Sequence, residues 1–145
     1  MSRRSKPLEK LQREKPWACA SVSSSDHFQP LFSSLMRSAA FKDMRKGARL
    51  LLMCCMTEAG GEASRDNVDP DSGVYDERLF YMNRQLYSDV YDLYNPSNGA
   101  GFRRDMEDLI DHGFVEQVVR GQGRGIKNLY RLSSKWRKWS KPEKG

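Results

Sequence analysis

The sequence predicts a small domain of the α+β class, mainly α-helical with one small β-hairpin. Three stretches between residues 42 and 113 carry apolar side chains at the spacing of an amphipathic helix. Behind them, two runs rich in valine, isoleucine and tyrosine flank the glycine-rich loop RGQGRG, which is the pattern of a hairpin. With 145 residues, the chain has room for one compact core and flanking tails.

The first residues are not expected to join that core. Residues 1–27 mix Lys, Arg, Ser, Pro and Glu with few apolar side chains, too few to offset the entropy lost on ordering. We therefore expect a disordered basic arm over residues 1–27, a folded domain over 28–140 and a tail over 141–145. The folded domain begins with a short helix in the Phe28 to Phe41 segment. Apolar residues at helical spacing there are Leu31, Phe32, Leu35 and Met36.

The clearest helix is predicted within residues 42–59, before Gly60 and Gly61 stop it. One of its faces carries Met44, Ala48, Leu51, Leu52 and Cys55. Leu50 and Met53 point the other way. A helix that is apolar on two sides needs a cover on both, and either the preceding segment or another subunit could supply the second.

The middle of the chain predicts a loop, a strand and two helices. Residues 62–76 are acidic and contain Pro and Gly, whereas ERLFYMN (77–83) is expected to be a short strand. Asn83 is a suitable N-cap for a helix over residues 84–94, which ends before Pro96. Its inward face is predicted to hold Leu86, Val90, Leu93 and Tyr94.

A further helix is expected over about residues 98–112, capped by Asn98 or Ser97 and stopped by Gly113. Its inward residues are predicted to be Phe102, Met106, Leu109 and Ile110. The strands of the hairpin follow in FVEQVV and IKNLYRL, but Val115 and Val118 would lie on opposite faces of a regular strand, so the register stays open. The order helix, loop, short strand, helix, helix, hairpin is that of a winged helix-turn-helix, with a recognition helix at 98–112 and a wing at 114–132.

Positive charge is concentrated at the two ends of the chain. The net charge is +6, yet residues 1–16 carry six Lys or Arg against two Glu, and residues 120–145 carry nine against one. Residues 17–119 carry ten against sixteen acids. This asymmetry favours a polyanionic partner, although a solvated surface with basic ends would have the same composition.

The start of the recognition helix is the first candidate contact with DNA. In a helix-turn-helix, this turn enters the major groove, and its unpaired amides also favour phosphate. The candidate residues are Ser97, Asn98, Gly99, Ala100, Arg103 and Arg104. The alternative is that Arg103 pairs with Glu107 and Arg104 with Asp108, each four residues further on, so that these charges only support the helix.

The wing is the second candidate contact. No acidic residue occurs between Val119 and Ser140, and the cations that we expect to grip the DNA backbone or minor groove are Arg120, Arg124, Lys127 and Lys135. The alternative is a solvated hairpin. In either case Trp136 and Trp139 are expected to close the core.

Other classes of function lack the residues they need. The chain has no apolar run long enough for a membrane span and no apolar block behind its basic start, so we expect an intracellular protein. Cys19, Cys54 and Cys55 form no metal-ligand pattern. His27 and His112 lack a catalytic partner at motif spacing, and His112 is expected to act as a cation at a helix end. We therefore expect no enzyme activity, no catalytic residues, no metal, no cofactor and no small-molecule substrate.

A family resemblance agrees with these patterns. The stretches DLIDHGFVE and NLYRLSSKW, within the last three quarters of the chain, resemble small winged helix-turn-helix proteins of Gram-positive conjugative elements, plasmids and phages. Some of these are similar to replication-initiator amino-terminal domains. The resemblance implies binding to duplex DNA in replication, transfer or transcription of such an element, in the bacterial cytoplasm at the nucleoid. A homodimer is a possible state on different grounds, because a second copy of the chain could cover Leu50 and Met53. The alternatives are a winged helix that binds another protein without contacting DNA and one that binds RNA.

Overall fold

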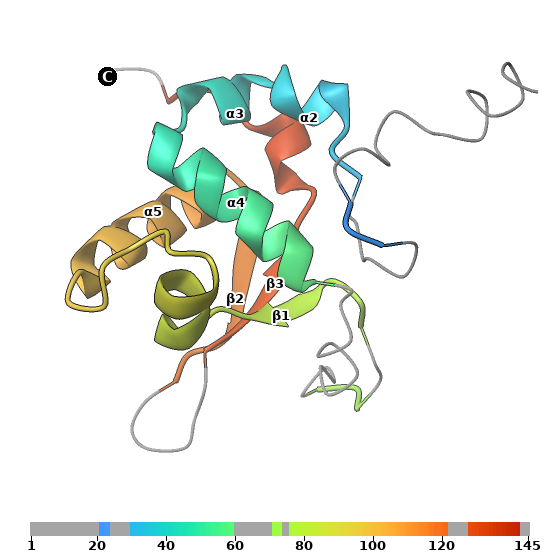
Figure 1. Ribbon diagram of the computed structural model, residues 1–145. Helices are drawn as coiled ribbons and strands as arrows, with labels where there is room; N and C mark the ends of the chain where they lie inside the picture. Colours follow the sequence, from blue (N-terminus) through green and yellow to red (C-terminus); the bar gives the residue numbers. More distant parts are fainter. Residues whose placement is uncertain (1–20, 24–29, 60–70, 74–75, 122–127, 143–145) are drawn as a thin grey trace, which may run out of the picture.

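The computed structural model of the protein describes residues 21–23, 30–59, 71–73, 76–121 and 128–142. It confirms the α+β class, because helices pack against a small three-stranded antiparallel sheet in the described part of the chain (Figure 1). Helices α4 (Lys46–Glu58) and α5 (Gly99–Asp111) contact each other, and they also contact strands β1 and β2, respectively. Apart from residues 21–23, the expected basic arm lies outside the described residues. None of the described helices has the length and apolar character needed to cross a bilayer.

The segment before α4 forms two short helices and not the single one predicted. They are α2 (Ser33–Met36) and α3 (Ala39–Asp43). The break occurs at Ser38, whose backbone is extended and whose hydroxyl accepts a hydrogen bond from the Phe41 amide at 3.1 Å, so that a new helix starts there. Of the four apolar residues at helical spacing, only Leu35 is buried, whereas Leu31, Phe32 and Met36 are exposed.

The prediction for α4 is confirmed on its inner face. Met44, just before the helix, is buried together with the inward residues Ala48, Leu51, Leu52 and Cys55. Leu50 and Met53 keep 52% and 49% of their surface exposed, so α2 and α3 leave this outer side uncovered. The helix ends at Glu58, and the predicted stop at Gly60 and Gly61 lies outside the described residues.

Strand β1 (Leu79–Tyr81) lies within the predicted segment, but the next helix differs from its prediction. Asn83 does act as a cap, since its side-chain oxygen accepts a hydrogen bond from the Leu86 amide at 3.0 Å. The helix η3 (Gln85–Val90) is a π-helix, and the Tyr91 amide reaches back five residues to the Leu86 carbonyl at 2.9 Å. Because a π-helix has a wider turn, it places other residues on its inner side than an α-helix with about 3.6 residues per turn would. The predicted inward face is confirmed in part: Leu86, Leu93 and Tyr94 are partly buried against the core. The prediction is wrong for Val90, which is 58% exposed, and Tyr87 and Ser88 are buried in addition.

Helix α5 begins and ends as predicted. Asn98, and not Ser97, is the N-cap, and its side chain accepts a hydrogen bond from the Gly101 amide at 3.0 Å. Phe102, Met106 and Leu109 are buried, and Ile110 packs against the core while half-buried. At the other end, the Phe114 amide bonds to the Leu109 carbonyl at 3.0 Å and the Gly113 amide to the Ile110 carbonyl at 3.1 Å, which is a Schellman motif with Gly113 at a φ of +82°.

Strands β2 (Val115–Val119) and β3 (Leu129–Leu132) form the hairpin, and the order in the sheet is β1-β3-β2. Val115 pairs with Leu132 and Gln117 with Tyr130, but Val119 is the next residue to pair, opposite Leu129. A bulge at Val118 therefore explains why simple alternation could not give the register. The hairpin tip, residues 122–127, lies outside the described residues.

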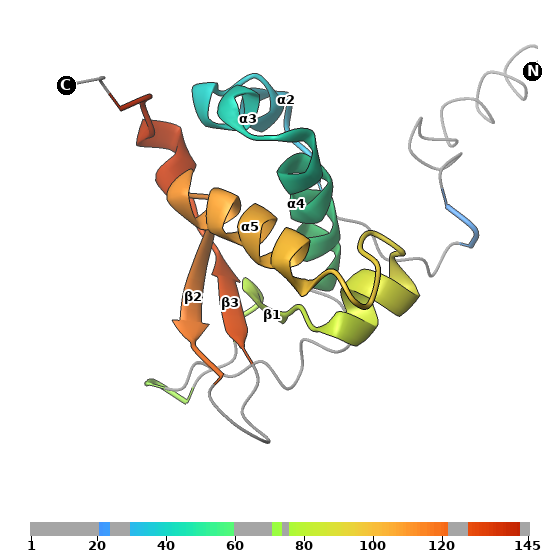
Figure 2. The same cartoon turned by 90° about the vertical axis from the view of Figure 1, so that its left-hand side faces the viewer.

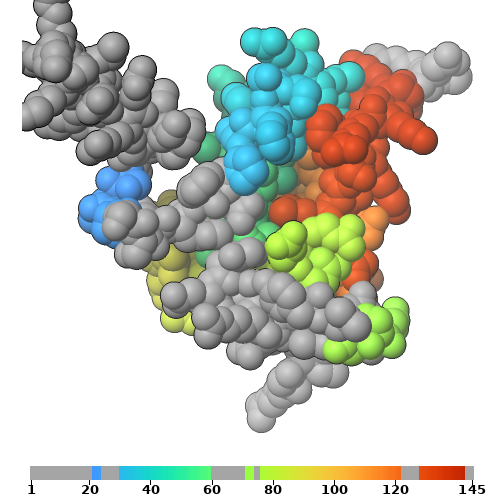
Figure 3. Space-filling view, turned by 90° about the vertical axis from the view of Figure 1, so that its right-hand side faces the viewer, coloured from blue at the N-terminus to red at the C-terminus, as the bar shows by residue number. Residues whose placement is uncertain are grey.

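The carboxyl-terminal segment closes one end of the core, as predicted for the two tryptophans. It contains the 3₁₀-helix η4 (Lys135–Lys138), which lies against α3 (Figure 3). The Trp136 ring stacks on Phe114 with centroids 5.7 Å apart, and the Trp139 ring lies over the His112 ring at 4.7 Å. Both tryptophans are partly buried against the core.

Candidate nucleic-acid interface

The first turn of α5 presents backbone donors at the surface. Asn98 and Ala100 are exposed and Gly99 is half-buried. The Asn98 and Gly101 amides are already used, by the Asn95 carbonyl and the Asn98 side chain. The Gly99 and Ala100 amides are left without a partner among the described residues, so they are available to an anion. The Ser97 hydroxyl is exposed and donates to the Asn95 side chain at 2.9 Å.

Arg103 and Arg104 are exposed and form no ion pair within the described part of the chain. The alternative in which they pair with Glu107 and Asp108 is therefore not what the structure contains. Asp108 instead accepts a hydrogen bond from the Arg45 amide at 3.2 Å and lies 3.3 Å from Nδ1 of His112. Both arginines are thus available to a ligand.

The two halves of α5 differ in their exposed charge. Arg103 and Arg104 occupy the amino-terminal half, whereas Glu107 and Asp111 are exposed toward the carboxyl end. Phosphates would be repelled by that second half. A polyanion can therefore approach only the amino-terminal half of the helix.

A buried carboxylate holds this helix against α4. Asp105 is 3% exposed and accepts a hydrogen bond from the Tyr94 hydroxyl at 2.5 Å. The pKa of Tyr94 lies far above its ordinary value. Burial is the largest cause, and the hydrogen bond to the Asp105 carboxylate is the second. Gly47 on α4 allows the close approach, because a Cβ there would lie 2.6 Å from Oδ2 of Asp105. The orientation of α5, and so of its first turn, depends on this contact.

His112 ends the same helix and is held as a cation. Nδ1 lies 2.7 Å from the Asp108 carbonyl oxygen and Nε2 lies 2.9 Å from Oδ2 of Asp43. Both partners can only accept hydrogen bonds, so both ring nitrogens must carry a proton. Burial alone would lower the pKa of His112, but the hydrogen bonds to Asp43 and Asp108 outweigh it and raise the pKa above 6.5. This agrees with the prediction of a cation at the end of the helix.

The end of β2 next to the hairpin turn contributes one described cation. Arg120 is exposed and directly follows β2. Asn128 fixes this region, because its side-chain oxygen accepts hydrogen bonds from the Gly121 amide at 2.6 Å and the Gln117 side chain at 3.1 Å. Arg124 and Lys127 lie outside the described residues.

Lys135 lies apart from the other predicted site residues. It belongs to η4, at the end of the hairpin opposite to its tip (Figure 2). Its ammonium group is 3.2 Å from Oε1 of Glu116. The structure therefore groups the start of α5 with Arg120, but does not bring Lys135 to the same place.

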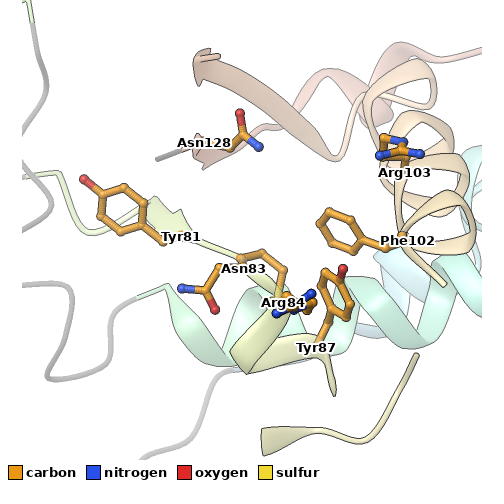
Figure 4. Close-up of a pocket in the computed structure, with 9 residues that line it drawn as sticks. Tyr81, Asn83, Arg84, Tyr87, Phe102, Arg103 and Asn128 are labelled. Carbon is orange, nitrogen blue, oxygen red and sulfur yellow. The ribbon is translucent and has the colours of Figure 1, made fainter. Parts of the chain in front are cut away.

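Two adjoining hollows lie between α5 and the hairpin. The smaller, of about 250 Å³, has Arg103 and Arg120 in its wall together with Glu107. The larger, of about 390 Å³, lies between β1, η3, the start of α5 and Asn128 (Figure 4). We call the larger hollow the nucleotide-sized pocket, and it is lined in part by Tyr81, Asn83, Arg84, Tyr87, Phe102, Arg103 and Asn128.

Sequence reasoning named Gly99 and Arg103 of this pocket as site residues, but none of its other lining residues. Tyr87 packs in the structure, with its ring stacked on Phe102 at 4.4 Å. Arg84 and Asn128 come from distant segments. No local pattern would have joined them, because the π-helix and the bulged hairpin determine where they meet.

Among the described residues, no group of three or more His, Cys, Asp or Glu side chains is arranged to hold a metal ion. Cys54 and Cys55 are free thiols, and burial raises the pKa of both. Comparisons with protein-family models, with curated proteins and with solved structures find no match to this chain.

Proposed function

We propose that the protein is a non-catalytic winged helix-turn-helix protein that binds duplex DNA. The element order supports the fold: α4, β1, η3, α5 and the β2-β3 hairpin follow one another. In the sheet, β1 pairs antiparallel with β3, so the first strand lies beside the second strand of the hairpin. In this arrangement η3 and α5 are the two helices of a helix-turn-helix, and the hairpin is the wing.

The observation that best supports DNA binding is that Arg103 and Arg120 line the same hollow. Arg103 comes from the start of the proposed recognition helix and Arg120 from the turn end of the first wing strand, and both are exposed and line one hollow. Together with the free Gly99 and Ala100 amides, they offer an anion several donors on one side of the molecule. Arg124 and Lys127 add two further cations in the sequence of the hairpin.

In the proposed complex, the first turn of α5 enters the major groove, and the wing contacts the backbone or the minor groove. Arg104 is the residue placed to read a base edge, because arginine recognises guanine with two hydrogen bonds. The resemblance to proteins of mobile elements suggests a role in replication, transfer or transcription, within the bacterial cytoplasm at the nucleoid.

A salt titration tests this function. Neutralising about four to six phosphates predicts that log K for a random duplex falls against log salt with a slope of about −4 to −5. The affinity of the full chain should be measured by fluorescence anisotropy between about 50 and 200 mM salt. Association that does not depend on salt, or no binding at low salt, would contradict the proposal.

The second candidate is a winged helix that binds a protein partner. The observation that favours it is the outer side of α4, where Leu50 and Met53 are about half exposed. A duplex that fails to bind at low salt would favour this function.

A further inference from the structure

The nucleotide-sized pocket has a composition that duplex contacts alone do not need. Among the described residues that line it, Arg84 and Arg103 are the only charged ones, and none carries a carboxylate. The remaining walls include three aromatic rings, Tyr81, Tyr87 and Phe102. Its volume of about 390 Å³ lies in the range of about 300 to 1,000 Å³ that is usual for small-ligand pockets. Cations beside aromatic rings suit a ligand that is both anionic and planar.

The hydroxyl group of a largely buried tyrosine opens into this pocket. Tyr87 is 6% exposed, and its hydroxyl forms no hydrogen bond with any described residue. A hydroxyl that reaches the pocket without a partner in the described part of the chain can donate a hydrogen bond to a ligand bound there. The hydroxyl lies 3.9 Å from the position that a Cβ on Gly99 would take, at the start of α5.

Arg103 converges on the same point. Its Nη1 lies 3.8 Å from that Cβ position on Gly99, so the guanidinium folds back toward the first turn of its own helix. The free Gly99 and Ala100 amides belong to this turn. A hydroxyl and a guanidinium thus lie next to the space that the missing side chain of Gly99 leaves, on the turn that carries the free Gly99 and Ala100 amides. All of these groups can donate to a phosphate.

The other part of the pocket can accept a base. Phe102 and Tyr81 form apolar walls on opposite sides, with Asn128 above them and Arg84 below in Figure 4. The side-chain oxygen of Asn128 is already occupied by Gly121 and Gln117, so its amide nitrogen remains to donate to a ligand. Base contact with aromatic side chains is worth about 1–3 kcal/mol per base and tolerates any sequence.

We infer that this pocket binds a single nucleotide unit, with its phosphate at Gly99, Arg103 and the Tyr87 hydroxyl and its base against Tyr81 and Phe102. The inference rests on the proposed DNA binding and extends it, because an unpaired nucleotide of a bound strand could enter from the groove between α5 and the wing. A free nucleoside monophosphate has the same chemistry, and the experiment separates the two sources.

The test compares three DNAs bound to the full chain at one salt concentration. They are an intact duplex, the same duplex with one central unpaired nucleotide, and the same duplex with an abasic residue at that position. The unpaired nucleotide should be bound about tenfold more tightly than either of the others, since only it offers both a phosphate and a base. The abasic duplex controls for the flexibility that an extra residue adds.

Variants locate the effect. Tyr87→Phe keeps the ring on Phe102 but removes the hydroxyl, so it should reduce the preference for the unpaired nucleotide about tenfold while thermal stability is retained. Lys138→Ala is the control for the loss of a cation, since Lys138 is exposed on η4 and does not line the pocket. It should leave the ratio between the three DNAs unchanged.

A calorimetric titration with free nucleoside monophosphates completes the test. In one combination of results, free nucleotides bind the unmodified chain and Tyr87→Phe weakens this binding about tenfold, while the three DNAs bind equally. That combination would support the pocket with a free nucleotide as its ligand. Equal binding of the three DNAs and no binding of free nucleotides would overturn the inference and leave duplex binding intact. If no DNA and no nucleotide binds, both the inference and the proposed function fail.

Discussion

The carbonyl oxygen of Gly113 accepts a hydrogen bond from the Trp136 amide at 3.0 Å. This bond joins the end of α5 to the segment that follows the hairpin, so the helix and the wing are fixed to each other at their common origin. Figure 2 shows α5 and strand β2 diverging from this point, with the start of α5 and the end of β2 at their far ends. The angle between the proposed recognition helix and wing therefore depends on Gly113.

Gly113→Ala should destabilise the fold. The residue has a φ of +82°, which costs a side chain about 1–3 kcal/mol, and a Cβ there would lie 2.6 Å from the Trp136 nitrogen. Chemical unfolding should show a loss of at least that size. Gly99→Ala is the control, because its Cβ would meet nothing closer than 3.8 Å, and it should change stability little. A Gly113→Ala protein as stable as the unmodified one would contradict this account.

The His112 contacts predict a pH dependence of stability. Hydrogen bonds to Asp43 and Asp108 raise the pKa of His112 in the folded state above 6.5 despite its burial. The protonated ring therefore contributes stability that is fully present below the unfolded pKa of about 6.5 and is lost as pH rises through the higher folded value. The free energy of unfolding, measured from pH 6 to 9, should fall accordingly.

Asp43→Asn is the matched variant for this effect. It keeps the shape of the side chain but removes the charge that faces Nε2, so the fall in stability between pH 6 and 9 should become smaller. A nuclear magnetic resonance titration of the His112 ring measures the pKa directly. A midpoint at or below 6.5 in the unmodified protein would contradict the prediction.

The wing and the recognition helix should differ in what they contribute to DNA binding. Changing Arg120, Arg124 and Lys127 to Ala should weaken all duplexes about equally, because contacts to phosphates carry no sequence information. Arg104→Ala should instead reduce the preference for the true site by about 1–3 kcal/mol. Affinities for cognate and random duplex measure both effects. Equal losses on the two duplexes for Arg104→Ala would show that Arg104 contacts only the backbone.

Lys135→Ala provides an internal comparison. The ammonium group of Lys135 is paired with Glu116 and lies away from the hollow that Arg103 and Arg120 share. We expect Lys135→Ala to weaken DNA binding less than Arg120→Ala does at the same salt concentration. A larger loss for Lys135 would mean that DNA approaches a different side of the molecule.

Helical periodicity predicted the parts of the fold that depend on local spacing. Phe102, Met106 and Leu109 were assigned correctly because α5 is a regular helix with a side-chain cap at Asn98 and a glycine stop. The pattern failed at Val90, where the π-helix changes the number of residues per turn. It left the hairpin register open because the bulge at Val118 interrupts alternation.

The candidate site was predictable only where it is local. The first turn of α5 could be named from its cap and its outward arginines. Asp105, by contrast, faces Gly47 and Tyr94 in the interior, and a charged residue on the inner side of a helix contradicts the usual pattern. Arg84, Tyr87 and Asn128 line one pocket only because of the tertiary arrangement. Their spacing along the chain does not predict that they lie around the same pocket.

The outer side of α4 predicts self-association. Leu50 and Met53 keep about half of their surface exposed, and neither α2 nor α3 covers them. A two-fold dimer through this surface would bury both residues twice and could present two recognition helices to successive major grooves, about 34 Å apart. Sedimentation equilibrium of the full chain at tens of micromolar should therefore show a dimer.

Replacing Leu50 and Met53 with Glu separates a dimer contact from a covered surface. Both side chains already reach solvent, so the two new carboxylates need not be buried in the monomer. The variant should therefore remain folded, with a melting temperature close to that of a single unmodified chain. Its sedimentation should give the mass of one chain. Asp89→Lys, a change of charge at an exposed position on η3, is the control and should leave the dimer intact. A monomer in the unmodified protein would rule out the homodimer, and a variant that unfolds would show that another part of the chain covers this side of α4.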